Sequence, residues 1–108
     1  MDFEPDDRWY AVRSLFQITD DGGTAYEERI TLWQAGSVDQ AVEKARGEAE
    51  EYAEFAGLAY LPGFAQAYPL ADSPPRDGAE VFSLIRDSAL PPQPYVERFF
   101  STGQERQQ

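Results

Sequence analysis

The segment TDDGGT, residues 19–24, constrains the fold most, because it joins two segments that alternate between apolar and polar residues. A glycine pair beside aspartates is typical of the tight turn of a β-hairpin. We therefore expect two antiparallel strands, over residues 9–18 and 25–35. The more apolar face of the first strand is expected to meet the core, and it carries Tyr10, Val12, Ser14, Phe16 and Ile18.

The turn also determines which faces of the two strands coincide. If the chain reverses near Gly22 and Gly23, even-numbered residues oppose even-numbered residues, and the core face collects Tyr26, Ile30 and Leu32. A bulge near the turn would shift this register by one residue and exchange the faces. With the even-to-even register, the opposite face carries Trp9, Arg13, Ala25, Glu27, Arg29, Thr31 and Trp33.

The segment GSVDQAVEKARGEAEEYAEFAG predicts an amphipathic helix that begins after Ser37 and ends at Gly57. Ser37 and Gln40 have the spacing of a capping box, and Gly57 is suited to the position that follows a helix. Apolar residues recur at helical spacing. The predicted buried stripe consists of Val38, Ala41, Val42, Ala45, Ala49, Tyr52 and Phe55.

Two more strands, over residues 63–70 and 79–87, and a short helix anchored by Tyr95, Val96, Phe99 and Phe100 complete the expected elements. The order ββαββα predicts an α+β fold, a four-stranded, mainly antiparallel sheet with the helices packed on one face. A length of 108 residues suits one domain. We expect it to span residues 9–101, between an acidic flexible tail at 1–8 and a polar tail at 102–108.

Charge restricts the possible partners. The chain has 20 acidic against 9 basic residues, a net charge of −11. Nucleic-acid binding depends on clustered Lys and Arg, so we expect no nucleic acid as a partner. An acidic surface suits a basic protein partner, or serves solubility alone.

Several kinds of chemistry are excluded by residues that the sequence lacks. Without Cys or His there are no thiol nucleophiles, disulfides or imidazole bases, and the common ligands of zinc, copper and haem are missing. Phosphate-loop and serine-hydrolase motifs are absent, and no acidic pair has the spacing of an established metal loop. We expect no cofactor, no metal and a non-enzymatic protein.

The sequence also argues against a membrane. No apolar run approaches the roughly 20 residues that a membrane-spanning helix needs. The acidic N-terminus, MDFEPDDRW, has no apolar stretch typical of a signal peptide. We therefore expect no membrane association and a cytoplasmic location.

The segment YEERI places three consecutive charges in a predicted strand. With the even-to-even register, Glu27 and Arg29 lie on the outer face and Glu28 points toward the core. A buried carboxylate needs a hydrogen bond or a counter-charge, and Arg86 is a candidate partner. The simplest alternative is that Glu28 reaches solvent at a frayed strand end; a structural ion pair and a ligand site are the others.

A second polar constellation is IRDS, residues 85–88. Asp87 or Ser88 before Pro91 is typical of a side-chain-capped turn, and Arg86 can fork onto a carboxylate. On the sheet, Trp9 and Trp33 would share a face that either the C-terminal segment or a partner covers. The candidate binding residues are Trp9, Arg13, Tyr26, Glu27, Glu28, Arg29, Trp33, Arg86 and Asp87.

Four motifs, WYAVRSLF, YEERI, EVFSLIRDS and YVERFFSTGQERQ, occur in an order that resembles the small bacterial proteins of domain-of-unknown-function family 4288. The resemblance covers about residues 9–107. It implies that YEER and RDS are family hallmarks, and it supplies no activity or catalytic residues to transfer.

Three functional hypotheses follow. The leading one is a protein-binding module that forms a homodimer through the Trp9/Trp33 face or a sheet edge, because aromatic residues with Arg are typical interface anchors. The second is a small-ligand or enzyme site where Arg13, Glu28 and Arg86 converge in a pocket lined by Tyr10 and Tyr26. The third is an acidic inhibitor of a basic toxin or nuclease, as an immunity protein or antitoxin would be.

Overall fold

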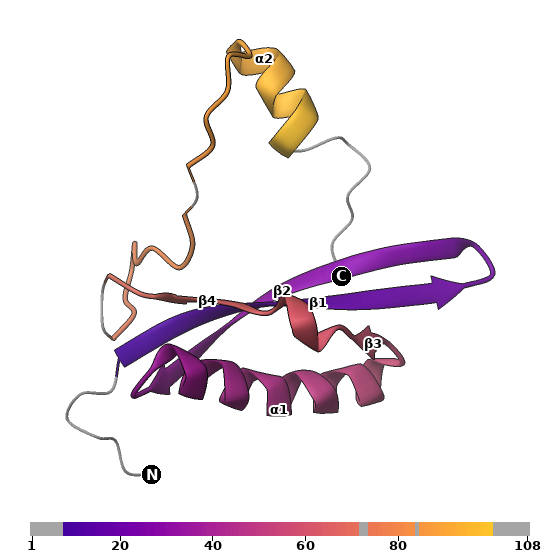
Figure 1. The fold of residues 1–108 in the computed structure, drawn as a ribbon, viewed down its shortest axis with the longest axis vertical. Helices are drawn as coiled ribbons and strands as arrows, with labels where there is room; N and C mark the ends of the chain where they lie inside the picture. The colour runs from indigo at the N-terminus through magenta and orange to yellow at the C-terminus, as the bar shows by residue number, and fades with distance from the viewer. Residues whose placement is uncertain (1–7, 72–73, 84, 101–108) are drawn as a thin grey trace.

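Two long strands, β1 (Arg8–Asp20) and β2 (Gly23–Ala35), pair antiparallel along their whole length. The structure, a computed structural model, describes residues 8–71, 74–83 and 85–100. The predicted tails at 1–8 and 102–108 lie outside these ranges, except for Arg8, which begins β1. The hairpin expected from TDDGGT is confirmed (Figure 1).

The register of this hairpin differs from the even-to-even prediction. Asp20 pairs with Gly23, and the Asp20 carboxylate accepts a hydrogen bond from the Gly22 backbone N–H at 2.8 Å. The turn is therefore Asp21–Gly22, and Gly23 belongs to β2 with a φ of 118°, which favours glycine. Even-numbered residues of β1 consequently oppose odd-numbered residues of β2, so the faces of β2 are exchanged.

β1 is the central strand of the sheet. Its side away from β2 pairs with two short strands, β3 (Ala59–Tyr60) at Phe16 and Gln17, and β4 (Gln66–Pro69) at Tyr10 to Arg13. The 3₁₀ turn η1 (Pro62–Phe64) lies between them. The predicted strand over 63–70 is thus shorter than expected, and a two-residue strand precedes it.

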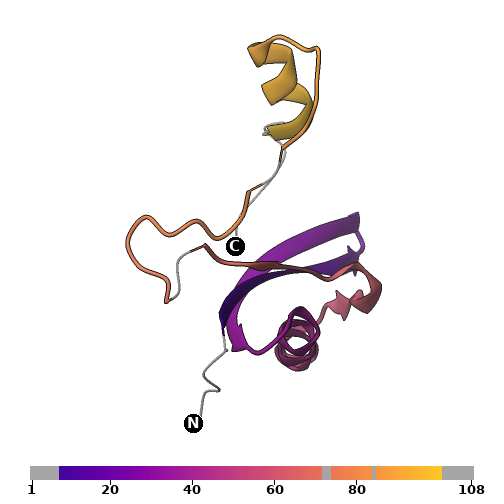
Figure 2. The ribbon, with the colours of Figure 1, turned by 60° about the vertical axis from the view of Figure 1, so that its left-hand side comes forward.

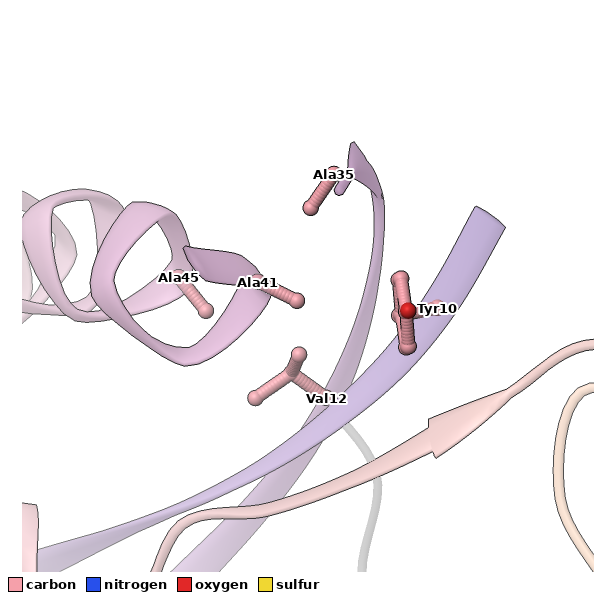
Figure 3. Packing of buried hydrophobic residues seen from close by; sticks show 5 residues of the cluster. All are labelled: Tyr10, Val12, Ala35, Ala41 and Ala45. Carbon is pink, nitrogen blue, oxygen red and sulfur yellow. The ribbon is translucent and has the colours of Figure 1, made fainter. Parts of the chain in front are cut away.

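The helix α1 (Val38–Ala56) lies across one face of this sheet (Figures 1 and 2). Both predicted caps are confirmed: Ser37 Oγ accepts from the Gln40 backbone N–H at 3.1 Å, and Gly57 ends the helix with a φ of 74°. The helix buries Ala41, Ala45, Ala49 and Ala53. Figure 3 shows Ala41 and Ala45 directed toward Val12 of β1.

The core consists of this alanine stripe, the even-numbered residues in the middle of β1, and the buried residues Ala11, Ala35 and Leu70. Tyr10, Val12, Ser14 and Phe16 are all buried, which confirms the predicted core face of that strand. Small helix residues let the helix backbone approach the sheet closely. The ends of the predicted helix stripe were wrong, since Val38 is half-exposed and Phe55 is 91% exposed.

The C-terminal part of the chain does not complete the sheet. Among its described residues, which omit Leu84, the segment 79–87 forms no strand, contrary to prediction. The helix α2 (Pro92–Tyr95) continues into the π-helical turn η2 (Val96–Phe100) and stands apart from the sheet, on the side opposite α1 (Figures 1 and 2). The α+β class and the four-stranded antiparallel sheet are confirmed.

Candidate functional site

The charges of YEERI are divided between the two faces of the sheet. Because of the observed register, Glu27 and Arg29 point to the face that α1 covers, hereafter the inner face. Glu28 points to the outer face, the one turned away from α1. The prediction that Glu28 is the inward carboxylate was wrong, and the alternative with exchanged faces is the one observed.

On the inner face Arg29 and Glu27 bind two residues of α1. The Arg29 guanidinium reaches Glu48 with both terminal nitrogens, at 3.2 and 3.3 Å, and lies 3.7 Å from the centre of the Tyr52 ring. The Tyr52 hydroxyl donates to Glu27 Oε1 at 2.7 Å. Glu48 and Tyr52 are one helical turn apart, so they face β2 together. This inner cluster attaches α1 to β2 and has a structural role.

The inner cluster changes the acidity of one of its members. The hydrogen bond that Tyr52 donates to Glu27 raises the pKa of the Tyr52 hydroxyl, with burial and the negative charge of Glu27 acting in the same direction. The Arg29 charge opposes this shift. The neutral hydroxyl is therefore the form that the fold stabilises.

This shift predicts a loss of stability in alkali. With a folded-state pKa above the ordinary value of about 10, Tyr52 binds its proton more tightly when folded than when unfolded. Its contribution is constant below about pH 10 and is lost as the pH rises through the folded-state pKa. We expect Tyr52→Phe to show a smaller decrease in the free energy of unfolding between about pH 9 and pH 11 than the wild type, measured by urea unfolding.

Tyr60 provides the comparison, because burial raises its pKa too. Tyr60→Phe should remove a separate part of the alkaline decrease and leave the Tyr52 part in place. A Tyr52→Phe variant with the wild-type pH dependence would contradict the assignment to the Glu27 hydrogen bond.

On the outer face an ion pair joins the two long strands. Arg13 of β1 donates to Glu28 Oε1 of β2, and the guanidinium lies 5.5 Å from the Phe82 ring centre. Both side chains are well exposed, at 36% and 52%. Beside this pair is a hollow of about 260 Å³, lined by Arg13, Ser14, Leu15, Glu28, Phe64 and Gln66.

Three apolar side chains of β2 stand next to this ion pair. Tyr26 is 60%, Ile30 43% and Leu32 37% exposed, and all three point outward. We call these residues the β2 strip. They were predicted to be core residues, and the register places them on the surface. The sequence pattern alone could not identify these residues as exposed, because the register of the hairpin decides which face of β2 they occupy.

The β2 strip lies along an edge of the sheet. β2 pairs with β1 on one side, and within the described residues its other side has no strand neighbour. Phe82 packs edge-on against Tyr68 of β4 at 5.3 Å and so covers the part of the outer face remote from β2. The β2 strip is left uncovered by the described chain.

The remaining candidate residues do not gather into one site. Trp9 lies outward, opposite Gln34, whereas Trp33 lies inward and packs against the core cluster around Tyr10 and Val12. The predicted Trp9/Trp33 face was therefore wrong. Asp87 is exposed, and the capped turn predicted for this segment is formed by Ser88, whose hydroxyl accepts from the Leu90 backbone N–H at 3.1 Å.

Arg86 is likewise separate from Arg13 and Glu28. Its guanidinium donates to the Tyr95 hydroxyl at 3.3 Å and lies 4.3 Å from the centre of the Phe99 ring. Of the ligand site expected from Arg13, Glu28 and Arg86, the structure brings together only the first two. The expected tyrosine lining is also divided, with Tyr10 inward and Tyr26 outward.

Comparison with family models, with curated proteins and with solved structures finds no match to this chain. The resemblance to domain-of-unknown-function family 4288 therefore stays a prediction. In the part of the chain that the structure describes, no helix has the length and apolar character needed to cross a bilayer.

Proposed function

We propose that the protein is a binding module that acts through protein–protein contacts and whose partner is a second copy of itself. The observation that carries this proposal is the β2 strip, in which Ile30 and Leu32 lie next to one another on the outer face and Tyr26 lies on the other side of Glu28. Apolar side chains gathered on a protein surface are typical of a contact site. Their position at a sheet edge adds unpaired backbone groups to the same surface.

The neighbouring ion pair suits this role. Arg13 and Glu28 neutralise one another beside the strip, so a partner that covers it meets no unmatched charge. The hollow next to them can receive an apolar or aromatic side chain, which is how interface anchors are seated. Arg and Tyr are both enriched in the centres of interfaces.

A second copy is the favoured partner because the chain itself supplies the complementary surface. Its C-terminal residues expose Leu90, Val96 and Phe99, and the β2 strip stays uncovered. Self-association would bury two exposed apolar surfaces of one sequence at once. Two identical copies would also repeat every contact by symmetry, which doubles the effect of each residue.

Ile30→Glu tests the proposal. We expect the wild type to be a dimer by size-exclusion chromatography with light scattering, and the variant to dissociate. Burial of one Ile side chain contributes about 1.5–3 kcal/mol, and the residue counts twice in a symmetric dimer. The dissociation constant should therefore rise at least about 100-fold.

Phe55→Glu is the matched control, since Phe55 is 91% exposed on α1 and far from the proposed contact. It introduces the same charge at an apolar surface residue and should leave the dimer intact. A monomeric wild type, or an Ile30→Glu variant that dimerises as tightly as Phe55→Glu, would contradict the proposal.

A further inference from the structure

The C-terminal residues 85–100, hereafter the arm, form an ordered unit of their own. Arg86 joins the two ends of the arm through its hydrogen bond to Tyr95 and its position over Phe99, and the Tyr95 and Phe99 rings are 5.1 Å apart. The interactions of Arg86 thus give the arm a defined shape before it meets any other surface.

The arm presents apolar side chains to solvent. Ile85 is 95% exposed, and Leu90, Val96 and Phe99 are 37–45% exposed. Figures 1 and 2 both show the arm extending away from the sheet, with α2 at its far end. The Cα radius of gyration is 16.3 Å, whereas a compact chain of this length has about 13 Å. An isolated chain therefore leaves this apolar surface unburied.

The arm and the β2 strip lie on the same side of the sheet. α1 covers the inner face, and the arm projects beyond the outer face, where Tyr26, Ile30 and Leu32 are exposed (Figures 1 and 2). Two exposed apolar surfaces in one chain can be buried against one another, either within the same chain or between two chains.

The placement and charge of the arm favour the arrangement between chains, because the arm stands away from its own sheet (Figures 1 and 2). Pro91, Pro92 and Pro94 restrict the backbone at the centre of the arm, so the arm keeps its shape when it meets another surface. The arm has two basic and two acidic residues and no net charge, while residues 8–71 have five basic and ten acidic residues. The arm is thus the segment that approaches a second acidic body with the least repulsion.

We propose that two copies exchange their arms, each arm covering the β2 strip of the other copy. This inference rests on the proposed self-association and specifies the element that covers the strip. Each copy would contribute the 16 residues of the arm and the outward residues of its hairpin. The number of contacting residues in each copy would then approach that of a standard interface, which has about 20–30 residues per partner.

The absence of cysteine from the sequence permits a direct test on the full-length protein. Ile30→Cys and Phe99→Cys proteins are mixed, allowed to exchange and treated with a short bismaleimide. Cross-linked peptides are then identified by mass spectrometry. We expect a 30–99 link between the two variants in the dimer fraction. A mixture of Phe55→Cys and Phe99→Cys proteins is the control and should give no such link.

The outcomes separate this inference from the proposed function. A dimer that gives only 30–30 links would support self-association through the strip and overturn arm exchange. A 30–99 link formed within single chains of the Ile30→Cys/Phe99→Cys double variant, in a monomer fraction, would show that the arm closes on its own sheet and would overturn both. Monomeric wild-type protein without any 30–99 link would also overturn both.

Discussion

Replacing Phe16 with Ala is expected to lower the free energy of unfolding by about 3–5 kcal/mol. Phe16 is one of the largest side chains that are fully buried, and it connects three elements. Its ring packs edge-on against Tyr52 of α1 at 5.2 Å and beside Tyr60 of β3 at 5.5 Å. The cavity left by Ala cannot close, because its walls belong to a strand, a helix and a second strand.

The expected loss is a large part of the total free energy of unfolding, which is about 5–15 kcal/mol for a typical domain. Urea unfolding should show a lower midpoint at an unchanged slope. Phe16→Leu, which keeps most of the volume, should lose about 1.5 kcal/mol or less. Phe82→Ala removes an equal ring from the outer face, where Phe82 is only half-buried, and should lose clearly less than Phe16→Ala. Equal losses at the two positions would contradict the assignment of the core.

The local elements could be predicted because their signals lie within a few residues. The even-numbered apolar face of β1 is visible in the sequence, and Phe16 and Val12 are buried as expected. The ends of α1 follow from Ser37 and Gly57, whose cap geometry needs no distant partner. In these segments the sequence pattern and the tertiary structure agree.

The register of the hairpin could not be predicted from the same information. It depends on the number of residues in the turn: the observed two-residue turn, Asp21–Gly22, pairs even-numbered with odd-numbered residues, whereas a three-residue turn would pair even with even. A shift of one residue moves every side chain of β2 to the other face. The uncertainty about this one turn therefore affects which residues face the core. Ile30 and Leu32 were predicted to face it, and Arg29 and Trp33 face it instead.

The predicted strand at 79–87 failed for a different reason. Val81, Ser83 and Ile85 alternate as a strand should, but a strand also needs a partner. β4 already pairs with β1 from Tyr10 to Arg13, next to the place where Phe82 packs. Alternation is a local property and contains no information about which sheet edge is available.

Of the candidate site residues, the sequence identified the residue types and missed their grouping. Arg13 and Glu28 do meet, whereas Trp9 and Trp33 lie on opposite faces and Arg86 belongs to the arm. Glu48 and Tyr52, the inner partners of YEERI, were not considered as a pair. Their spacing of one helical turn was the signal that could have identified them.

The two arginines of the hairpin allow the role of the inner cluster to be measured. Arg29→Ala removes the ion pair to Glu48 and the contact with the Tyr52 ring, and it leaves Glu48 without its cation. Breaking a fully buried pair costs about 3–5 kcal/mol. Because the Arg29 and Glu48 side chains are 26% and 34% exposed, we expect a smaller loss, of about 2 kcal/mol, in the free energy of unfolding by urea.

Arg13→Ala is the matched control, because it removes the other Arg–Glu pair of the same hairpin. That pair is more exposed, so its loss should stay below about 1 kcal/mol. Arg29→Lys retains the charge but cannot form the bidentate ion pair with Glu48 or stack flat on the Tyr52 ring. It should therefore recover only part of the lost free energy of unfolding. Had YEERI pointed Arg29 outward, both alanine variants would lose equally little. A clear difference between them therefore tests the register itself, and with it the exposure of the β2 strip on which self-association depends.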